Sequence, residues 1–172
     1  ADDAIAWYEN NGAADPSWTA ADITTSADGA QSVFVADMDS DGDLDIVSAS
    51  MNDDAIAWYE NDGAADPSWT AADIATSADG ARSVFAADMD GDGDLDIVSA
   101  STIDDAIAWY ESNGAASSSQ TARGISAWTE VVAGSSFDNA NDVIHADIDG
   151  DGDLDMVAVS SGNDDDVSWF IN

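Results

Sequence analysis

Cysteine and lysine are both absent from the 172 residues of this chain, and only Arg82 and Arg123 carry a fixed positive charge. Without cysteine there is no disulfide framework and no thiolate metal site. Without a cationic surface the chain cannot neutralise phosphates, which excludes nucleic-acid binding. No apolar run approaches the roughly 18 residues that a membrane-spanning helix needs, so membrane insertion is not expected either.

Acidic residues dominate what is present. Thirty-seven Asp and Glu give a formal net charge of −35, and nearly all of them are Asp. Hydrophobic residues nevertheless make up 45% of the chain and seven are Trp, which predicts a globular protein and not a disordered acidic tail. So much like charge requires bound cations or a salty medium. The two arginines are expected to pair with neighbouring carboxylates.

The sequence repeats itself with a period of 51 residues. The segment AIAWYE begins at Ala4, Ala55 and Ala106, and a diverged copy begins at Val167. Each unit contains four short segments with β-branched or aromatic residues, and Asn-Gly or Asp-Gly turns separate several of them. Helical periodicity is sustained nowhere. The pattern predicts an all-β fold of four-stranded antiparallel units, which are the blades of a β-propeller.

The units divide the chain as a single repeat array. Residues 1–25 are predicted to supply the third and fourth strands of a partial blade, and residues 26–76 form repeat 1. Residues 77–133 form repeat 2 with an insertion at 115–127, and residues 134–172 form repeat 3 without its fourth strand. This makes about three blades, whereas propellers have four to eight. We therefore expect a fragment of a longer array, or a protomer whose partner supplies further blades.

A nine-residue acidic segment, D-x-D-x-D-G-D-L-D, lies between the first and second strands of each unit. In the second unit, the side chains of Asp88, Asp90 and Asp92 converge if the chain curls, and a glycine at the sixth position permits that turn. Asp94 would offer its backbone carbonyl and Asp96 a further carboxylate. Clustered carboxylates without His or Cys favour Ca²⁺. Bound calcium would also compensate the crowded charge.

Three other interpretations of these segments fit the sequence less well. An EF-hand needs a bidentate Glu at the twelfth position, where this chain has Ser48, Ser99 and Ala158, and its flanks are helices and not strands. A solvated acidic turn without an ion does not explain three copies of one spacing. Magnesium takes fewer carboxylates than these segments offer.

The segment FAADMDGDGDLDIVSAS, together with DDAIAWYENDG in the preceding unit, resembles the FG-GAP/VCBS repeats of integrin-α-type β-propellers. The letters FG and GAP do not occur, so the chain is closer to the VCBS-like branch. The resemblance covers nearly the whole chain and implies an extracellular or cell-surface protein with a calcium-binding loop in each blade. Carried onto this sequence, the ligands of three Ca²⁺ sites are Asp37, Asp39, Asp41, Asp43 and Asp45; Asp88, Asp90, Asp92, Asp94 and Asp96; and Asp147, Asp149, Asp151, Asp153 and Asp155.

Tryptophan recurs at two positions of the unit. The tryptophans of the third strands are expected to pack between blades, and those that open the outer strands are expected to be partly exposed, where a sugar could stack on them. The two sets are Trp7, Trp58, Trp109 and Trp169, and Trp18, Trp69 and Trp128.

Two functions fit these patterns. The first is a calcium-binding extracellular β-propeller segment that acts as a structural or adhesion scaffold or a protein-interaction module. The alternative is a lectin with sugar sites between blades. The expected partners are other blades of the same or a partner chain, together with a protein or glycan ligand. An enzyme is not expected, because His145 stands alone, no nucleophile elbow or phosphate loop occurs, and calcium accounts for the acidic clusters.

Overall fold

The computed structural model describes residues 3–112, 128–134, 138–162 and 167–171, and for 128–134 the backbone only. The insertion at 115–127, Arg123 and the side chain of Trp128 therefore lie outside the described part of the chain. Within that part, no helix is long and apolar enough to cross a membrane.

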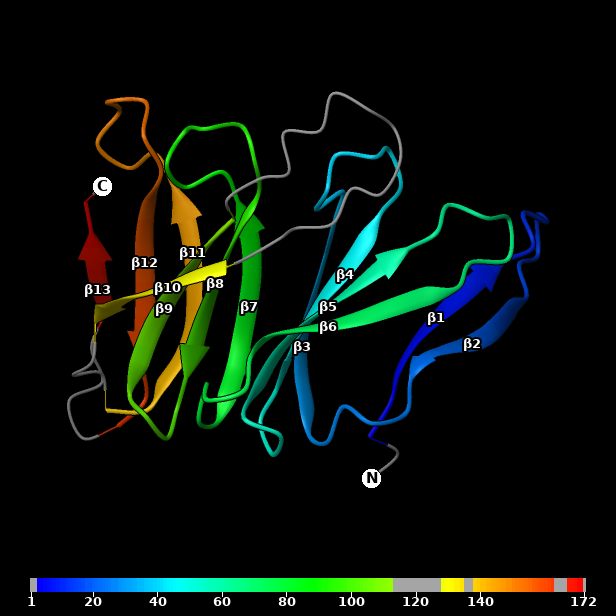
Figure 1. The fold of residues 1–172 in the computed structure, drawn as a ribbon, viewed down its shortest axis with the longest axis horizontal. Helices are drawn as coiled ribbons and strands as arrows, with labels where there is room; N and C mark the ends of the chain where they lie inside the picture. Colours follow the sequence, from blue (N-terminus) through cyan, green and yellow to red (C-terminus); the bar gives the residue numbers. More distant parts are fainter. Residues whose placement is uncertain (1–2, 113–127, 135–137, 163–166, 172) are drawn as a thin grey trace.

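The described residues form thirteen strands in four antiparallel sheets (Figure 1). The first sheet contains β1 (Ile5–Asn10) and β2 (Trp18–Thr24), and the second contains β3 (Ala30–Ala36), β4 (Asp45–Ser50), β5 (Ala55–Asn61) and β6 (Trp69–Ala75). The third contains β7 (Ala81–Ala87), β8 (Asp96–Ser101), β9 (Ala106–Ser112) and β10 (Trp128–Gly134). The fourth contains β11 (Ala140–Ala146), β12 (Asp155–Ser160) and β13 (Val167–Phe170).

Alternation along the second strands explains why each sheet can pack on both faces. Ile46 belongs to the cluster against the first sheet, whereas the next residue, Val47, belongs to the cluster against the third sheet. In the next unit, Ile97 and Val98 divide in the same way between the second and fourth sheets. Successive side chains of a strand point to opposite faces, so DIVSAS buries apolar groups on both sides.

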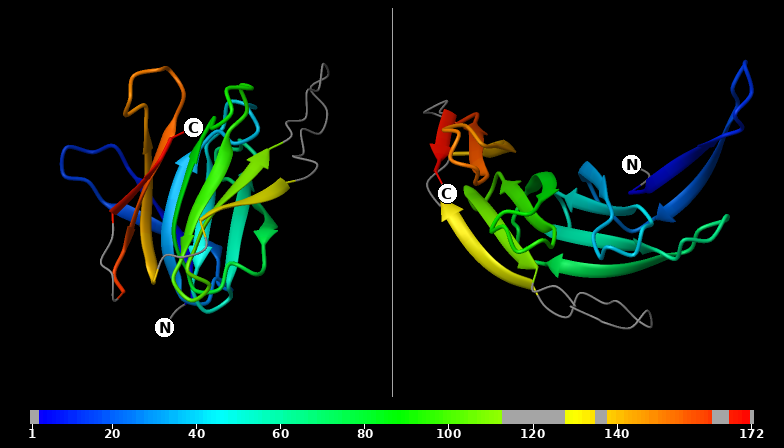
Figure 2. Two further views of the ribbon diagram at one scale, coloured as in Figure 1. Left: turned by 90° about the vertical axis from the view of Figure 1, so that its left-hand side faces the viewer. Right: turned by 90° about the horizontal axis from the view of Figure 1, so that it is seen from above.

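The sheets follow one another like propeller blades. Strand β7 lies against both β3 and β11, so the first strands of successive units are neighbours. Seen from above, these strands lie on one side of the molecule, and the outer strands β6 and β10 sweep away on the other (Figure 2). One apolar cluster fills each of the three spaces between neighbouring sheets. The predicted all-β fold of four-stranded antiparallel blade-like units is confirmed.

The faces of the first strands β3 and β11 that point away from β7 are uncovered in the described structure. Val33 on β3 is 52% exposed, whereas its counterpart Val84 on β7 is 4% exposed. At the other end, Ile144 on β11 is 59% exposed, whereas its counterpart Phe85 is 6% exposed. The same positions are thus buried inside the array and exposed at its ends.

Aspartates in the turns between the second and third strands connect each unit to the next through hydrogen bonds. The carboxylate of Asp54 accepts a hydrogen bond of 3.0 Å from the backbone N–H of Gly80, in the turn before β7. In the next unit, Asp105 accepts one of 2.8 Å from the N–H of Asn139. Asp54 and Asp105 both have positive φ values, of 54° and 55°, a conformation that Asp tolerates better than most residues.

The aromatic residues and the histidine follow the packing of the sheets. Trp58 is buried between the second and third sheets, and Trp109 packs against the cluster between the third and fourth, as expected for third-strand tryptophans. Trp169, on the uncovered end face, is exposed. The ring of His145 stacks on Phe85 with the ring centroids 4.6 Å apart, and its burial lowers the pKa of the histidine. This contact gives His145 a place in the packing between β7 and β11.

Candidate metal centres

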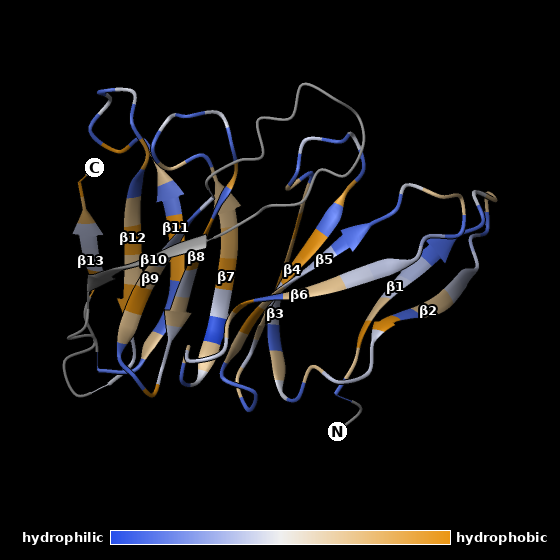
Figure 3. Ribbon diagram, viewed as in Figure 1, coloured by the Kyte–Doolittle hydropathy of each residue, from blue (hydrophilic) through white to orange (hydrophobic). Residues whose placement is uncertain are grey.

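The three acidic segments form equivalent loops at one edge of the molecule. They connect β3 to β4, β7 to β8, and β11 to β12. Figure 1 places all three at the same end of the sheets, and Figure 3 shows that this end is strongly hydrophilic. The position follows from the chain: each loop leaves the last residue of a first strand, and the first strands run side by side.

In each loop, three carboxylates offer oxygen atoms that lie within 4.8 Å of one another. Oxygens this close would repel strongly when ionised, and together they suit a hard cation with several oxygen ligands. The three groups are Asp37, Asp39 and Asp41; Asp88, Asp90 and Asp96; and Asp147, Asp149 and Asp155.

Hydrogen bonds from backbone N–H groups to the carboxylates hold each loop in a tight turn. In the second loop, Asp88 accepts hydrogen bonds from the N–H groups of Gly91 and Gly93, at 2.8 and 3.0 Å. Asp90 accepts one of 3.1 Å from Asp92, which in turn accepts one of 2.9 Å from Asp94. Gly93 has a φ of +98°, a value that a side chain would strain, which explains the glycine at the sixth position.

The ninth aspartate anchors the loop to the sheet. Asp96 is fully buried, and its two carboxylate oxygens accept hydrogen bonds of 3.0 Å from the N–H of Met89 and 2.7 Å from the N–H of Ser112. Asp45 is held in the same way by Met38 and Asn61, at 3.1 and 2.9 Å. The sequence predicted a metal ligand here, and the structure adds a link between the loop and the end of the third strand.

The structure brings together some of the predicted ligands and not others. The first and third aspartates belong to the carboxylate group in all three loops, the fifth only in the first loop, and the ninth only in the second and third. The seventh belongs to none, which is compatible with the sequence interpretation that it offers its backbone carbonyl. The side chain of Asp43 lies against Gly63, where a Cβ would fall 2.0 Å from its carboxylate oxygen.

A family model described as an FG-GAP-like repeat matches residues 1–48, 37–99 and 88–158. The chain belongs to the FG-GAP-like repeat family. Each FG-GAP-like match contains at least one complete acidic loop, so the loops are part of the repeat and not insertions into it. No curated protein matches the chain.

Carboxylates in the acidic loops of these FG-GAP-like repeats have raised pKa values. Burial, together with the charges of Asp41 and Asp45, raises the pKa of Asp39 to about 6. Burial also raises the pKa of Asp96, although the N–H groups of Ser112 and Met89 act in the opposite direction. Oxygen donors alone, raised pKa values and a glycine-curled loop all fit a calcium ion, which would stabilise the ionised carboxylates.

Calcium binding to the first FG-GAP-like loop is therefore expected to weaken below about pH 6, because the ion must displace the proton of Asp39. The stability of the metal-free chain depends on pH in the opposite direction. The pKa of Asp39 is about 6 in the folded state and 3.8 in the unfolded state, so the folded state binds the proton more tightly. The stability of the fold therefore falls as the pH rises from 3.8 to about 6. Calcium titrations at about pH 5 and about pH 7.5 measure the effect. The Asp39→Asn variant should lose this part of the pH dependence, and an affinity independent of pH in the unaltered chain contradicts the prediction.

Proposed function

We propose that the chain is a calcium-binding β-propeller segment of an extracellular or cell-surface protein, and that it serves as a structural or adhesion scaffold or protein-interaction module without catalytic activity. The observation that supports this most strongly is the recurrence of one carboxylate cluster in three equivalent loops along one edge. A single cluster could arise from acidic composition, but three copies in the same backbone geometry indicate a built site.

In this proposal, the loops hold calcium through the first, third and fifth or ninth carboxylates and the seventh backbone carbonyl. The ion supplies the positive charge that a chain of net charge −35 lacks. Because each loop leaves an inner strand and ends on the neighbouring one, calcium would fix the two strands relative to each other. Metal binding and folding are then coupled, and the module becomes rigid only where calcium is abundant.

The uncovered end faces support assembly with further blades. Val33 and Ile144 are exposed at positions whose counterparts are buried between units. In the proposal, blades of the same or a partner chain cover these faces, which would extend the array on both sides.

Hydrogen exchange with and without calcium tests the proposal directly. Calcium is expected to slow amide exchange in residues 37–45, 88–96 and 147–155, whose N–H groups bond to the ligand carboxylates, and to leave strand β6 nearly unchanged. Magnesium at the same concentration serves as the control. Equal protection by both ions, or none by either, would argue against dedicated calcium sites.

Carbohydrate binding is the second candidate, favoured by one observation. Trp18, which opens strand β2, is 59% exposed and so presents a flat apolar face on which a sugar could stack. A glycan array probed with the calcium-loaded chain, and with a Trp18→Ala variant as control, distinguishes the two functions. If the unaltered chain binds one class of sugar and the variant does not, the result supports a lectin. If neither binds any sugar, the result supports the scaffold function.

A further inference from the structure

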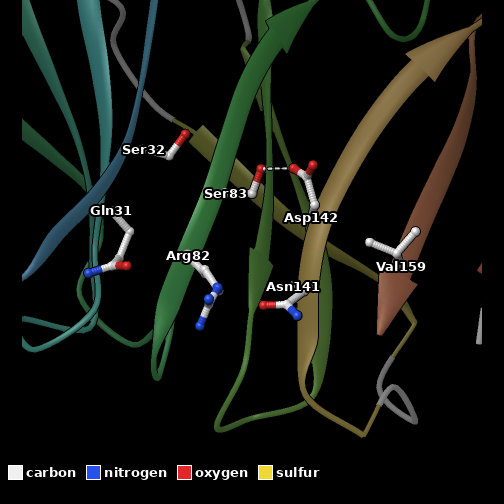
Figure 4. A pocket seen from close by; sticks show the side chains of 7 residues that line it. All are labelled: Gln31, Ser32, Arg82, Ser83, Asn141, Asp142 and Val159. Atoms are coloured by element: carbon white, nitrogen blue, oxygen red, sulfur yellow. Dashed lines mark hydrogen bonds between the residues drawn. The ribbon is translucent and has the colours of Figure 1, made fainter. Parts of the chain in front are cut away.

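A polar cavity of about 490 Å³ lies among the first strands of three successive units. Six of its seven lining residues are the second and third residues of the first strands, so it lies at the opposite end of these strands from the acidic loops. Figure 4 shows the side chains that line it. They are Gln31 and Ser32 of β3, Arg82 and Ser83 of β7, and Asn141 and Asp142 of β11, with Val159 of β12.

Three equivalent β-bulges direct side chains into this cavity. In β3, β7 and β11 alike, the pairing with the second strand shifts between the first and third residues. The residue between them, which is Gln31, Arg82 or Asn141, has no partner in the ladder. A bulge re-aims the side chain that it carries. In Figure 4 the three bulge residues lie at a similar level on three neighbouring strands.

The bulge is one of the few positions at which otherwise matching units differ. Residues 30–50 and 81–101 are identical except at three positions, where Gln31, Val35 and Ser40 are replaced by Arg82, Ala86 and Gly91. The units thus repeat the bulge and change the group that it presents. An amide, a guanidinium and a second amide surround the cavity as a result.

The two charged residues of the cavity, Arg82 and Asp142, form no ion pair with each other. Among the described residues Arg82 forms no ion pair, even though Asp142 lines the same cavity, so the expected local pairing of this arginine stays a prediction. Oδ1 of Asp142 accepts hydrogen bonds from the Ser83 hydroxyl at 2.5 Å and from the N–H of Val143 at 3.0 Å. Oδ1 of Asn141 is buried and has no hydrogen-bond partner in the described structure, although such acceptors are nearly always bonded.

We propose that this cavity binds a small zwitterion of the α-amino-acid class. The guanidinium of Arg82 would take the carboxylate in a two-pronged contact. The ammonium group would donate to Asp142. A ligand of this kind satisfies the positive group and the negative group together, and the cavity volume falls in the range usual for small-molecule sites.

Simpler ligands fit less well. An anion such as acetate would pair with Arg82 but would face the charge of Asp142. An amine would leave Arg82 unpaired. A net negative ligand would also meet the field of a chain of charge −35, whereas a zwitterion carries no net charge.

Calorimetric titration of the calcium-loaded chain with glycine, acetate and methylamine tests the proposal. Glycine is expected to bind, and acetate and methylamine to bind at least about tenfold more weakly, because each lacks one charged contact. Two variants are taken from the chain's own repeats: Arg82→Gln installs the residue of the preceding unit, and Asp142→Ser installs the residue of both preceding units. Each should weaken glycine binding at least about tenfold with little change in melting temperature.

The control variant is Asp66→Asn, which removes one charge from the turn between β5 and β6 and should leave glycine binding unchanged. Absence of glycine binding by the folded chain overturns the proposal. Acetate binding as tight as glycine binding, with loss only in Arg82→Gln, would also overturn it in favour of a plain anion site. Calcium titrations of the same samples report on the loops, so failure of the calcium proposal is distinguishable from failure of this one.

Discussion

Removal of calcium in low salt is expected to lower the melting temperature of the chain by roughly 15 °C or more. Each ion present at about a hundred times its dissociation constant adds about 2.7 kcal/mol to the folded state, and the three carboxylate groups provide three sites. The loss has a second source, because the empty loops retain close carboxylates that repel one another. Thermal melts with calcium and with a chelator measure the shift.

Salt and magnesium are the controls for that melt. High salt should restore part of the lost stability by screening the loop carboxylates, whereas magnesium at equal concentration should restore less than calcium. A melting temperature unaffected by the chelator in low salt would contradict the proposed sites.

Replacement of Asp96 by alanine is expected to destabilise the fold by about 3–5 kcal/mol in the presence of calcium. The substitution removes the Asp96 carboxylate that accepts from the buried N–H groups of Met89 and Ser112, and it takes a carboxylate out of the second cluster. Denaturant unfolding with calcium, and again with a chelator, separates the two contributions. The hydrogen-bond contribution should persist without metal.

Asp94→Ala is the matched control, since it removes a carboxylate from the same loop at a position outside the cluster. It should cost less than about 1 kcal/mol, because the seventh position is expected to act through its backbone carbonyl. Equal effects of the two substitutions would mean that Asp96 acts only as one more negative charge.

The fold could be predicted from the sequence because the patterns that indicate the strands and turns are local and repeated. The period of 51 residues, the alternation in DIVSAS and the turn residues indicated four-stranded units, and the sheets are built that way. The convergence of Asp88 and Asp90 was also predictable, because it depends on spacing within one short loop and on the turn at Gly93.

The features that could not be predicted from the sequence depend on contacts between segments that are far apart in the chain. Val33 and Val84 lie in nearly identical segments, yet one is exposed and the other buried, because only β7 has another first strand on each side in the described structure. The anchoring of Asp96 by Ser112 joins residues that are 16 positions apart. The cavity lined by Arg82 and Asp142 likewise joins residues of strands far apart in the chain.

Calcium stoichiometry is the most direct test of the proposed metal centres. Equilibrium dialysis of the metal-free chain, with metal content measured by elemental analysis, should give three calcium ions per chain, one for each carboxylate group. An Asp90→Ala variant should give two, since it disrupts the second loop alone. A chain that retains its fold and binds no calcium under these conditions would contradict the proposal.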